Sequence, residues 1–118
     1  MKSILTILFS VLFILPLLSE AAEQGNIELL SEAAEQGNID AKYKLAMIYR
    51  EKLGMPWRGA SLIEEAAKKG HPGAQYEYGI MHQSSELEFN REKALYWLQE
   101  AKKNGNEDAS KVLSDMLA

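Results

Sequence analysis

Carboxylates and serines are the side chains of this chain that could carry out catalysis, and none has the neighbours that catalysis needs. Glu64 with Glu65, and Glu107 with Asp108, are adjacent in the sequence. Neighbours on a helix diverge around it, whereas the two carboxylates of a glycoside hydrolase face each other. No serine lies in a nucleophile-elbow sequence or in an S-x-x-K motif with its partners, and no glycine-rich phosphate loop is present. We therefore expect no catalytic residue and a protein that is not an enzyme.

Metal and redox chemistry have no better support. The two histidines, His71 in an expected turn and His82 on an apolar stripe, have no second ligand type at metal-binding spacing. We expect both to be structural histidines with satisfied hydrogen bonds. The chain has no cysteine, which excludes disulfides, thiolate metal sites and cysteine nucleophiles together. We expect no metal and no cofactor.

Binding of another protein is the chemistry that the spacing does support. Six candidate partner-binding residues repeat the same helical spacing at a constant offset of thirty-three residues: Tyr43, Met47 and Arg50, then Tyr76, Ile80 and Gln83. Tyrosine and arginine are common interface anchors, and methionine adapts to varied apolar partners. The alternative is that these side chains pack one helix on the next, because stripes at helical spacing usually belong to a core.

Trp57 is a seventh candidate for the same partner. It lies between Pro56 and Arg58, in a stretch that we expect to be a loop. A loop tryptophan can anchor a partner, or it can fold back over a gap between helices, because its ring is apolar with one polar edge. The sequence leaves both possibilities open.

Helices must position these residues, because the sequence around them recurs with helical patterning. AAEQGNIDAKYKLAMIY, from Ala33 to Tyr49, returns as AAKKGHPGAQYEYGIMH, from Ala66 to His82. A period in the range of about thirty to forty-five residues indicates stacked helix pairs. We predict an all-α fold, an α-α superhelix in the form of a right-handed solenoid of antiparallel helix pairs.

The expected helices follow from capping residues and apolar spacing. Asn26 is the predicted N-cap of the first helix, and Gly37 is the left-handed residue that ends it. Later helices are expected near residues 39–52, 58–69, 72–83, 90–104 and 107–117, with Asn90 as the N-cap of the fifth and with Gly70 and Gly105 as further stops. The helix pairs would cover residues 27–69 and 73–104, and a capping helix with a polar outer face would cover 107–117.

The amino terminus has the layout of a secretory signal peptide. Lys2 precedes an apolar run from Ile4 to Leu18, and small residues follow at Ser19 and Ala21. We predict a signal peptide at residues 1–21, cleavage before Ala22 and a repeat domain at 22–118. The run is shorter than the roughly 20 residues that span a bilayer, but a membrane anchor that keeps the leader remains an alternative.

Charge and a short duplication add two constraints. The formal charge is -4, and no basic stripe suited to nucleic acid or anionic lipid is present. A neutral or basic protein partner is easier to accommodate. LLSEAAEQGNI occurs at 17–27 and again at 29–39, a spacing too short for a folded repeat unit, which suggests a recent slip-duplication whose first copy contributes little to the fold.

Two stretches carry a family resemblance: Gly-xxx-Ala-x-Tyr-x-Leu-Ala-xx-Tyr from Gly37 to Tyr49, and Ala-xx-Trp-xxx-Ala-xxx-Gly from Ala94 to Gly105. They resemble the Sel-one-like repeat, a helix-pair repeat related to the tetratricopeptide repeat. The resemblance implies first-helix packing positions at Ala41, Leu45, Ala46 and Tyr49, and again at Ala74, Tyr78, Gly79 and His82. It implies second-helix packing positions at Ala60, Ile63 and Ala67, then at Ala94, Trp97 and Ala101.

The resemblance also implies a function. Proteins of this family mostly hold other proteins or peptides on the concave face of the solenoid, and some small exported members look like immunity proteins that neutralise a toxin. We expect a periplasmic or secreted monomer that binds a protein or peptide, with no nucleic acid and, once the leader is removed, no membrane as partner. The alternatives are a weak envelope hydrolase acting on peptidoglycan or a β-lactam, and an inner-membrane-anchored scaffold.

Overall fold

A computed structural model describes residues 24–84 and 86–118, and all regular secondary structure in these two ranges is helical. The predicted signal peptide at 1–21 and its cleavage before Ala22 lie outside the described residues. Residues 24–35 are helical. The helices that follow are α2 (Ile39–Glu51), α3 (Pro56–Lys68), α4 (Pro72–Gln83), α5 (Arg91–Lys103) and α6 (Glu107–Leu117).

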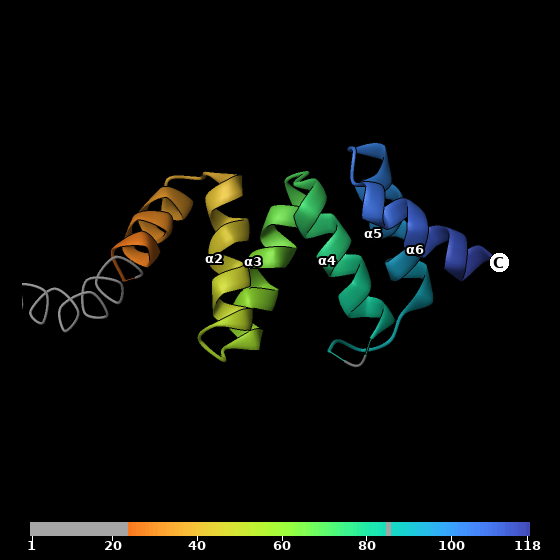
Figure 1. Cartoon of the computed structure of the whole chain (residues 1–118), viewed down its shortest axis with the longest axis horizontal. Coiled ribbons are helices and arrows are strands. Elements are labelled where there is room, and N and C mark those ends of the chain that lie inside the picture. Colours follow the sequence, from red (N-terminus) through yellow and green to blue (C-terminus); the bar gives the residue numbers. More distant parts are fainter. Residues whose placement is uncertain (1–23, 85) are drawn as a thin grey trace, which may run out of the picture.

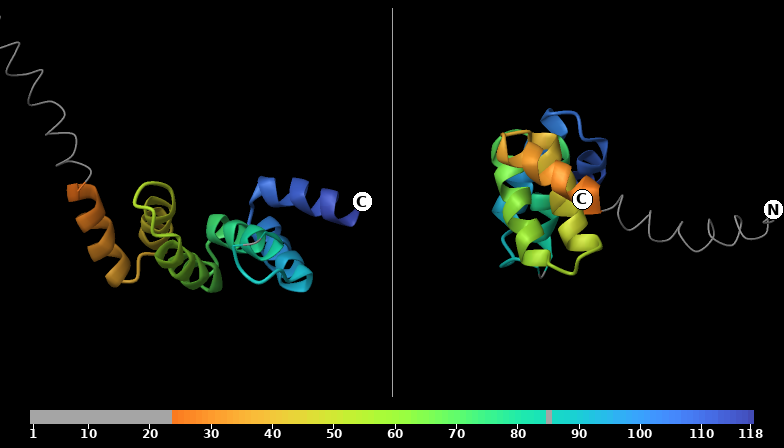
Figure 2. Two further views of the ribbon diagram at one scale, coloured as in Figure 1. Left: turned by 90° about the horizontal axis from the view of Figure 1, so that it is seen from below. Right: turned by 90° about the vertical axis from the view of Figure 1, so that its left-hand side faces the viewer.

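The helices pack in sequence order, and successive helices run in opposite directions from α2 to α5 (Figure 1). α2 packs on α3, α3 on α4, α4 on α5 and α5 on α6. Residues 24–35 lie beside α2 at one end of this row, and α6 lies at the other end (Figure 2). The predicted all-α fold of helix pairs is therefore confirmed. No helix within residues 24–84 and 86–118 is long and apolar enough to cross a membrane.

Three glycines end helices in the left-handed conformation, as the sequence predicts. Gly37, Gly70 and Gly105 have φ values of 94°, 96° and 99°. The N–H of Gly37 donates to the Ala34 carbonyl, and the N–H of the next residue, Asn38, donates to the Ala33 carbonyl. The same pair of bonds recurs after Gly70 and Gly105. A left-handed residue here satisfies helix-end carbonyls and turns the chain sharply into the next helix.

The residue after each of these glycines caps the next helix. Asn38 Oδ1 accepts from the Ala41 N–H at 2.9 Å, and Asn106 Oδ1 accepts from the Ala109 N–H at 2.9 Å. At the middle joint the cap is His71, whose Nδ1 accepts from the Ala74 N–H at 3.1 Å. The capping role of His71 was not anticipated, although its position directly after the glycine is the same as that of Asn38 and Asn106. Asn90 caps α5 as predicted, with Oδ1 accepting from the Lys93 N–H.

Two expected helix starts were wrong. Asn26 is not an N-cap, because residues 24–26 are already helical. α3 begins at Pro56 instead of Arg58. A proline is well suited to a first turn, since its missing N–H has no partner there in any case. Trp57 therefore lies in the first turn of α3, not in a loop.

Small residues let the paired helices approach closely. A Cβ on Gly59 of α3 would lie only 2.7 Å from the Ala46 carbonyl oxygen of α2. In the next pair, a Cβ on Gly79 of α4 would lie 2.8 Å from Leu98 Cγ of α5. Only glycine fits at these two crossings without a shift of the neighbouring atoms, which are backbone at Gly59 and the Leu98 side chain at Gly79.

The core of the described residues is divided into three clusters along the row of helices. The central cluster contains Ala46, Ile63, Ala66, Ala67, Ala74 and Met81. The amino-terminal cluster contains Ala34, Ala41 and Leu45, and the carboxyl-terminal cluster contains Leu98, Ala101, Ala109 and Leu113. Of the packing positions implied by the repeat pattern, Tyr49, Tyr78, Ala60 and Trp97 are partly buried and the others are buried. These positions therefore face inward, whereas Leu29 and Leu117, on the apolar faces of the two end helices, are 66% and 65% exposed.

Candidate partner-binding surface

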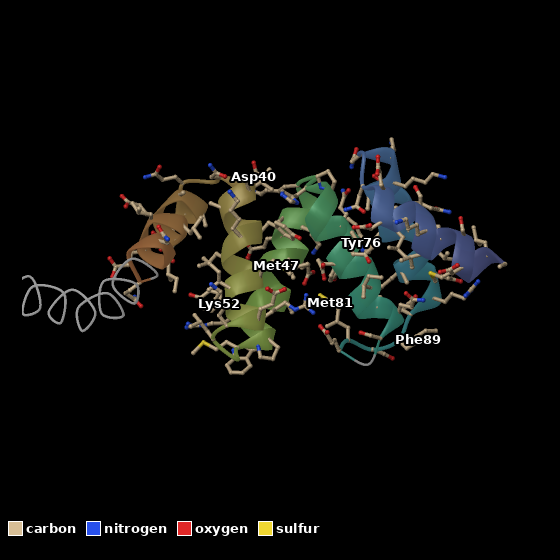
Figure 3. The ribbon with its side chains drawn as sticks, viewed as in Figure 1. Asp40, Met47, Lys52, Tyr76, Met81 and Phe89 are labelled. Carbon is tan, nitrogen blue, oxygen red and sulfur yellow. The ribbon has the colours of Figure 1, made fainter. Side chains whose placement is uncertain are left out.

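The structure places the two predicted stripes on α2 and α4. Met47 and Tyr76 mark these helices in Figure 3. Five of the six stripe residues are partly buried, and Gln83 alone among them is exposed. Trp57 is 68% exposed, so it does not fold back over a gap between helices. The candidate residues therefore differ in how much of each a partner can reach.

Tyr43 links the start of α2 to the start of α4. Its ring stacks on that of His71, with centroids 4.4 Å apart and planes at 28°. His71 Nε2 lies 2.9 Å from Asp40 Oδ1, so Asp40 and Tyr43 hold the imidazole from the same helix. Burial, with a smaller contribution from the nearby Glu77 carboxylate, raises the pKa of the Tyr43 hydroxyl. Tyr43 therefore stays neutral at physiological pH and acts as a packing and hydrogen-bonding group.

Arg50 makes ion pairs within the protein. Its guanidinium donates to Glu77 Oε2 at 3.1 Å and to Glu86 Oε2 at 2.6 Å. Its side chain is only 15% exposed. These bonds connect α2 to α4 and to the segment after α4. A partner that uses Arg50 must compete with two carboxylates, so the packing alternative has most support at this residue.

Tyr76 and Ile80 take part in the packing at the carboxyl-terminal end. Both are partly buried against the cluster that contains Leu98 and Leu113. Burial raises the pKa of the Tyr76 hydroxyl, with smaller contributions from Glu77 and Asp108. The α4 stripe therefore touches the next helices along the row, as the α2 stripe touches α4.

An open groove runs between the helix of residues 24–35 and α2. It has a volume of about 850 Å³. Tyr43 and Met47 contribute to one wall, and Leu29, which is 66% exposed, contributes to the other. The remaining lining residues are Asn26, Leu30, Ala33, Asn38, Asp40, Ala41, Lys44 and Ile48. We call this surface the amino-terminal groove.

The sequence predicted the binding candidates on one wall of the amino-terminal groove but not those on the other. The stripe spacing identified Tyr43 and Met47, whereas for Leu29 and Leu30 helical periodicity indicates only that they share the apolar face of the first helix. Their exposure depends on whether another helix packs against that face, and local periodicity does not predict this. The structure brings the two sets together across one groove.

A second groove lies on the other side of α2. It has a volume of about 450 Å³ and is bounded by residues 24–35, α2 and α3. Lys42 Nζ lies 3.2 Å from Glu65 Oε2 across it, and the Arg58 guanidinium lies 5.7 Å from the centre of the Tyr49 ring. These contacts already use three charged groups of this groove, Lys42, Arg58 and Glu65, so we regard it as a weaker binding candidate.

The two histidines have different environments. The expectation of a satisfied structural histidine is correct for His71, whose two ring nitrogens contact Ala74 N–H and Asp40. It is wrong for His82, which is 6% exposed and has no hydrogen bond to either ring nitrogen among the described residues. The His82 ring instead meets Tyr78 edge-on, with centroids 4.7 Å apart. Burial lowers the pKa of the His82 imidazole.

The described residues contain no group of three or more histidine, aspartate or glutamate side chains that could hold a metal ion. Ion pairs occupy several of the carboxylates, as in the bond of 2.7 Å between Glu64 and Lys68 on α3. What the arrangement offers is an apolar groove with a polar rim, a form suited to holding another chain.

The fold and this groove define a class: an all-α protein built from antiparallel helix pairs with an exposed apolar groove at one end of the row. In comparisons with protein-family models, curated proteins and solved structures, the chain has no match in any of the three. The resemblance to the Sel-one-like repeat therefore stays a prediction.

Proposed function

We propose that this protein is an exported protein-protein interaction module of the Sel-one-like repeat type. It binds a protein or peptide on the concave face of a short helical-repeat solenoid. The observation that carries the proposal is the amino-terminal groove, where Tyr43 and Met47 lie opposite the exposed Leu29. Exposed apolar surfaces of this kind, rimmed by polar residues, are typical of interaction sites.

The residues of the stripes suit recognition because they are only partly committed to packing. Tyr43 and Met47 contact the central cluster and also line the groove. A side chain that its own protein already holds in place loses little conformational freedom when a partner arrives. Trp57, in the first turn of α3, and Gln83, at the end of α4, extend the candidate surface as exposed groups.

The sharper form of the proposal is a periplasmic immunity protein that neutralises a toxin. It is supported by the leader-like amino terminus and by the formal charge of -4, which suits a neutral or basic partner. Mutual attraction between oppositely charged proteins mainly accelerates their encounter. The immunity role remains part of the proposal and depends on export.

The test is a pair of substitutions, Tyr43→Ala with Tyr76→Ala, in a chain that captures its partner from the compartment to which it is exported. Loss of both rings should abolish capture, since aromatic anchors often contribute 2 kcal/mol or more each, roughly thirtyfold in affinity. Capture and affinity would be measured by co-purification and isothermal titration calorimetry.

Tyr96→Ala is the matched control, because Tyr96 is 54% exposed on α5 and belongs to neither stripe. It should leave capture unchanged. Circular dichroism must show that the double variant keeps its helical content, since Tyr43 also stacks on His71. Undiminished capture by a folded double variant would exclude the stripes as the binding surface.

A further inference from the structure

The amino-terminal groove is the uncovered counterpart of a surface that is buried one repeat later. Its apolar floor includes Leu30, Ala33, Ala41 and Ile48. Thirty-three residues further along the chain, these positions become Ile63, Ala66, Ala74 and Met81. The second set is at most 1% exposed and forms most of the central cluster, whereas three of the first set are only partly buried.

A single helix, α2, covers the buried counterpart. Its residues Tyr43, Ala46 and Met47 belong to the central cluster or pack against it, between α3 and α4. The equivalent place, in front of residues 24–35 and α2, is the amino-terminal groove, and no helix of the described ranges 24–84 and 86–118 fills it. The repeat therefore shows what kind of object fits there, namely one helix placed much as α2 is. Asn26 stands in the register of Gly59, so this helix lies farther from residues 24–35 than α2 lies from α3.

The sequence of this chain does not supply that helix in the same register. The stretch thirty-three residues before α2 is Thr6–Leu18, and it has Phe13 in the register of Ala46 and Pro16 in the register of Tyr49. Ala46 is 0% exposed, which leaves no room for a larger side chain at the equivalent crossing. The stretch also belongs to the predicted leader.

A second copy of the chain does not supply it either. α6 is the end helix of the row, and its N-cap Asn106 corresponds to Asn38. In that register Lys111 replaces Tyr43 and Asp115 replaces Met47. Two charged side chains would then face the apolar floor of the groove, which is costly without partners. The occupant must come from a different protein.

At one place the rim of the groove carries a positive charge where its buried counterpart carries negative charges. Lys44 is in the register of Glu77, the carboxylate that accepts from Arg50 of α2 at 3.1 Å. Leu53 is in the register of Glu86, the second carboxylate bound to Arg50. A helix lying in the groove as α2 lies on α4 would therefore meet a cation where Arg50 meets two anions.

We propose that the amino-terminal groove binds one amphipathic helix of a partner protein, oriented as α2 is over α3 and α4 but farther from residues 24–35, where Asn26 replaces Gly59. The helix has a small residue in the register of Ala46, apolar residues in those of Tyr43 and Met47, and an acidic residue in that of Arg50, facing Lys44. This inference rests on the proposed function, because it names the kind of partner that the amino-terminal part of the binding surface accepts.

The probe is a synthetic peptide with the sequence of residues 38–52, held helical by a cross-link on its outer face, in which Arg50 is replaced by glutamate. A cross-link is needed because a free helix of this length is marginal in water. The unchanged peptide with arginine is the comparison. Binding to the protein, purified as the exporting cell delivers it, would be measured by fluorescence anisotropy at low and high salt.

The glutamate peptide should bind about two- to fivefold more tightly than the arginine peptide at low salt, the range of an exposed ion pair. High salt should reduce this difference. In the Lys44→Glu protein the preference should reverse. Leu29→Glu should abolish binding, and Leu117→Glu, at an equally exposed leucine of α6, should leave it unchanged.

Absence of binding, or a preference for glutamate that Lys44→Glu does not reverse, would overturn the inference. Its failure can be told apart from failure of the proposed function. If a Leu29→Glu protein still captures the natural partner while the Tyr43→Ala and Tyr76→Ala protein does not, the interaction module stands and the helix-in-groove inference falls.

Discussion

At the scale of single residues, His82 is the side chain whose environment is least well matched to its chemistry. It is buried in α4 and lacks hydrogen-bond partners among the described residues. The pKa of its imidazole is lowered chiefly by burial and also by Lys93, while the Glu88 backbone and the Glu64 carboxylate act in the opposite direction. The neutral ring is therefore the form that the fold accepts.

This environment predicts a loss of stability in mild acid. In the unfolded chain a histidine titrates near its ordinary pKa of about 6.5, so below that pH the unfolded state binds more protons than the folded state. The contribution from His82 is present above pH 6.5 and is lost as the pH falls through the lowered pKa of the folded state. Urea unfolding at pH 7.5 and at pH 5.5 would measure the change.

The variant His82→Phe separates this contribution from that of the carboxylates. Phenylalanine keeps the ring against Tyr78 but cannot be protonated, so the stability of the variant should fall less between the two pH values. It should also be more stable by about 1 kcal/mol at pH 7.5, because no unpaired ring nitrogens are buried. An identical pH dependence in the two proteins would contradict the assignment to His82.

At the scale of helices, the close crossing of α2 and α3 depends on Gly59. A methyl group at this position would meet the Ala46 carbonyl at 2.7 Å, and a backbone atom cannot move aside alone. Gly59→Ala should therefore destabilise the protein by about 1–3 kcal/mol through overpacking, measured by thermal or urea unfolding.

The matched control is the same substitution at Gly25. That residue is also helical, and a Cβ there has no atom within 4 Å. Because alanine is the better helix former, Gly25→Ala should be neutral or stabilising by up to about 1 kcal/mol. Equal effects at the two glycines would show that helix propensity, and not the crossing of α2 and α3, governs both.

At the scale of the whole molecule, the predicted export would determine at which residue the mature protein begins. The signal-peptide pattern predicts that the mature protein begins at Ala22, two residues before the helix of residues 24–35. Amino-terminal sequencing or intact-mass analysis of the protein recovered from the periplasm or medium would measure the start. A start at Met1 would support an anchored scaffold instead.

The local devices of the fold were predictable from the sequence because each depends on neighbouring residues. The left-handed stops at Gly37 and Gly70, the cap at Asn90 and the inward faces of the helices arise from backbone conformations and a 3.6-residue periodicity that a few adjacent residues determine. The errors at Asn26 and Arg58 concern where a helix begins. A residue typical of a helix start does not have to be the one at which the helix starts, and here residues 24–26 and Pro56 are already helical.

The arrangement of the candidate binding surface depends on contacts that no local sequence pattern contains. The spacing placed Tyr43 and Arg50 on one face, but only the packing of α2 against α4 shows that Arg50 is held by two carboxylates while Tyr43 borders an open groove. The repeat predicted that Leu30 and Ile63 are equivalent. The burial of each depends on the helix that covers it. α2 covers Ile63, whereas none of the described helices covers Leu30 in the same way.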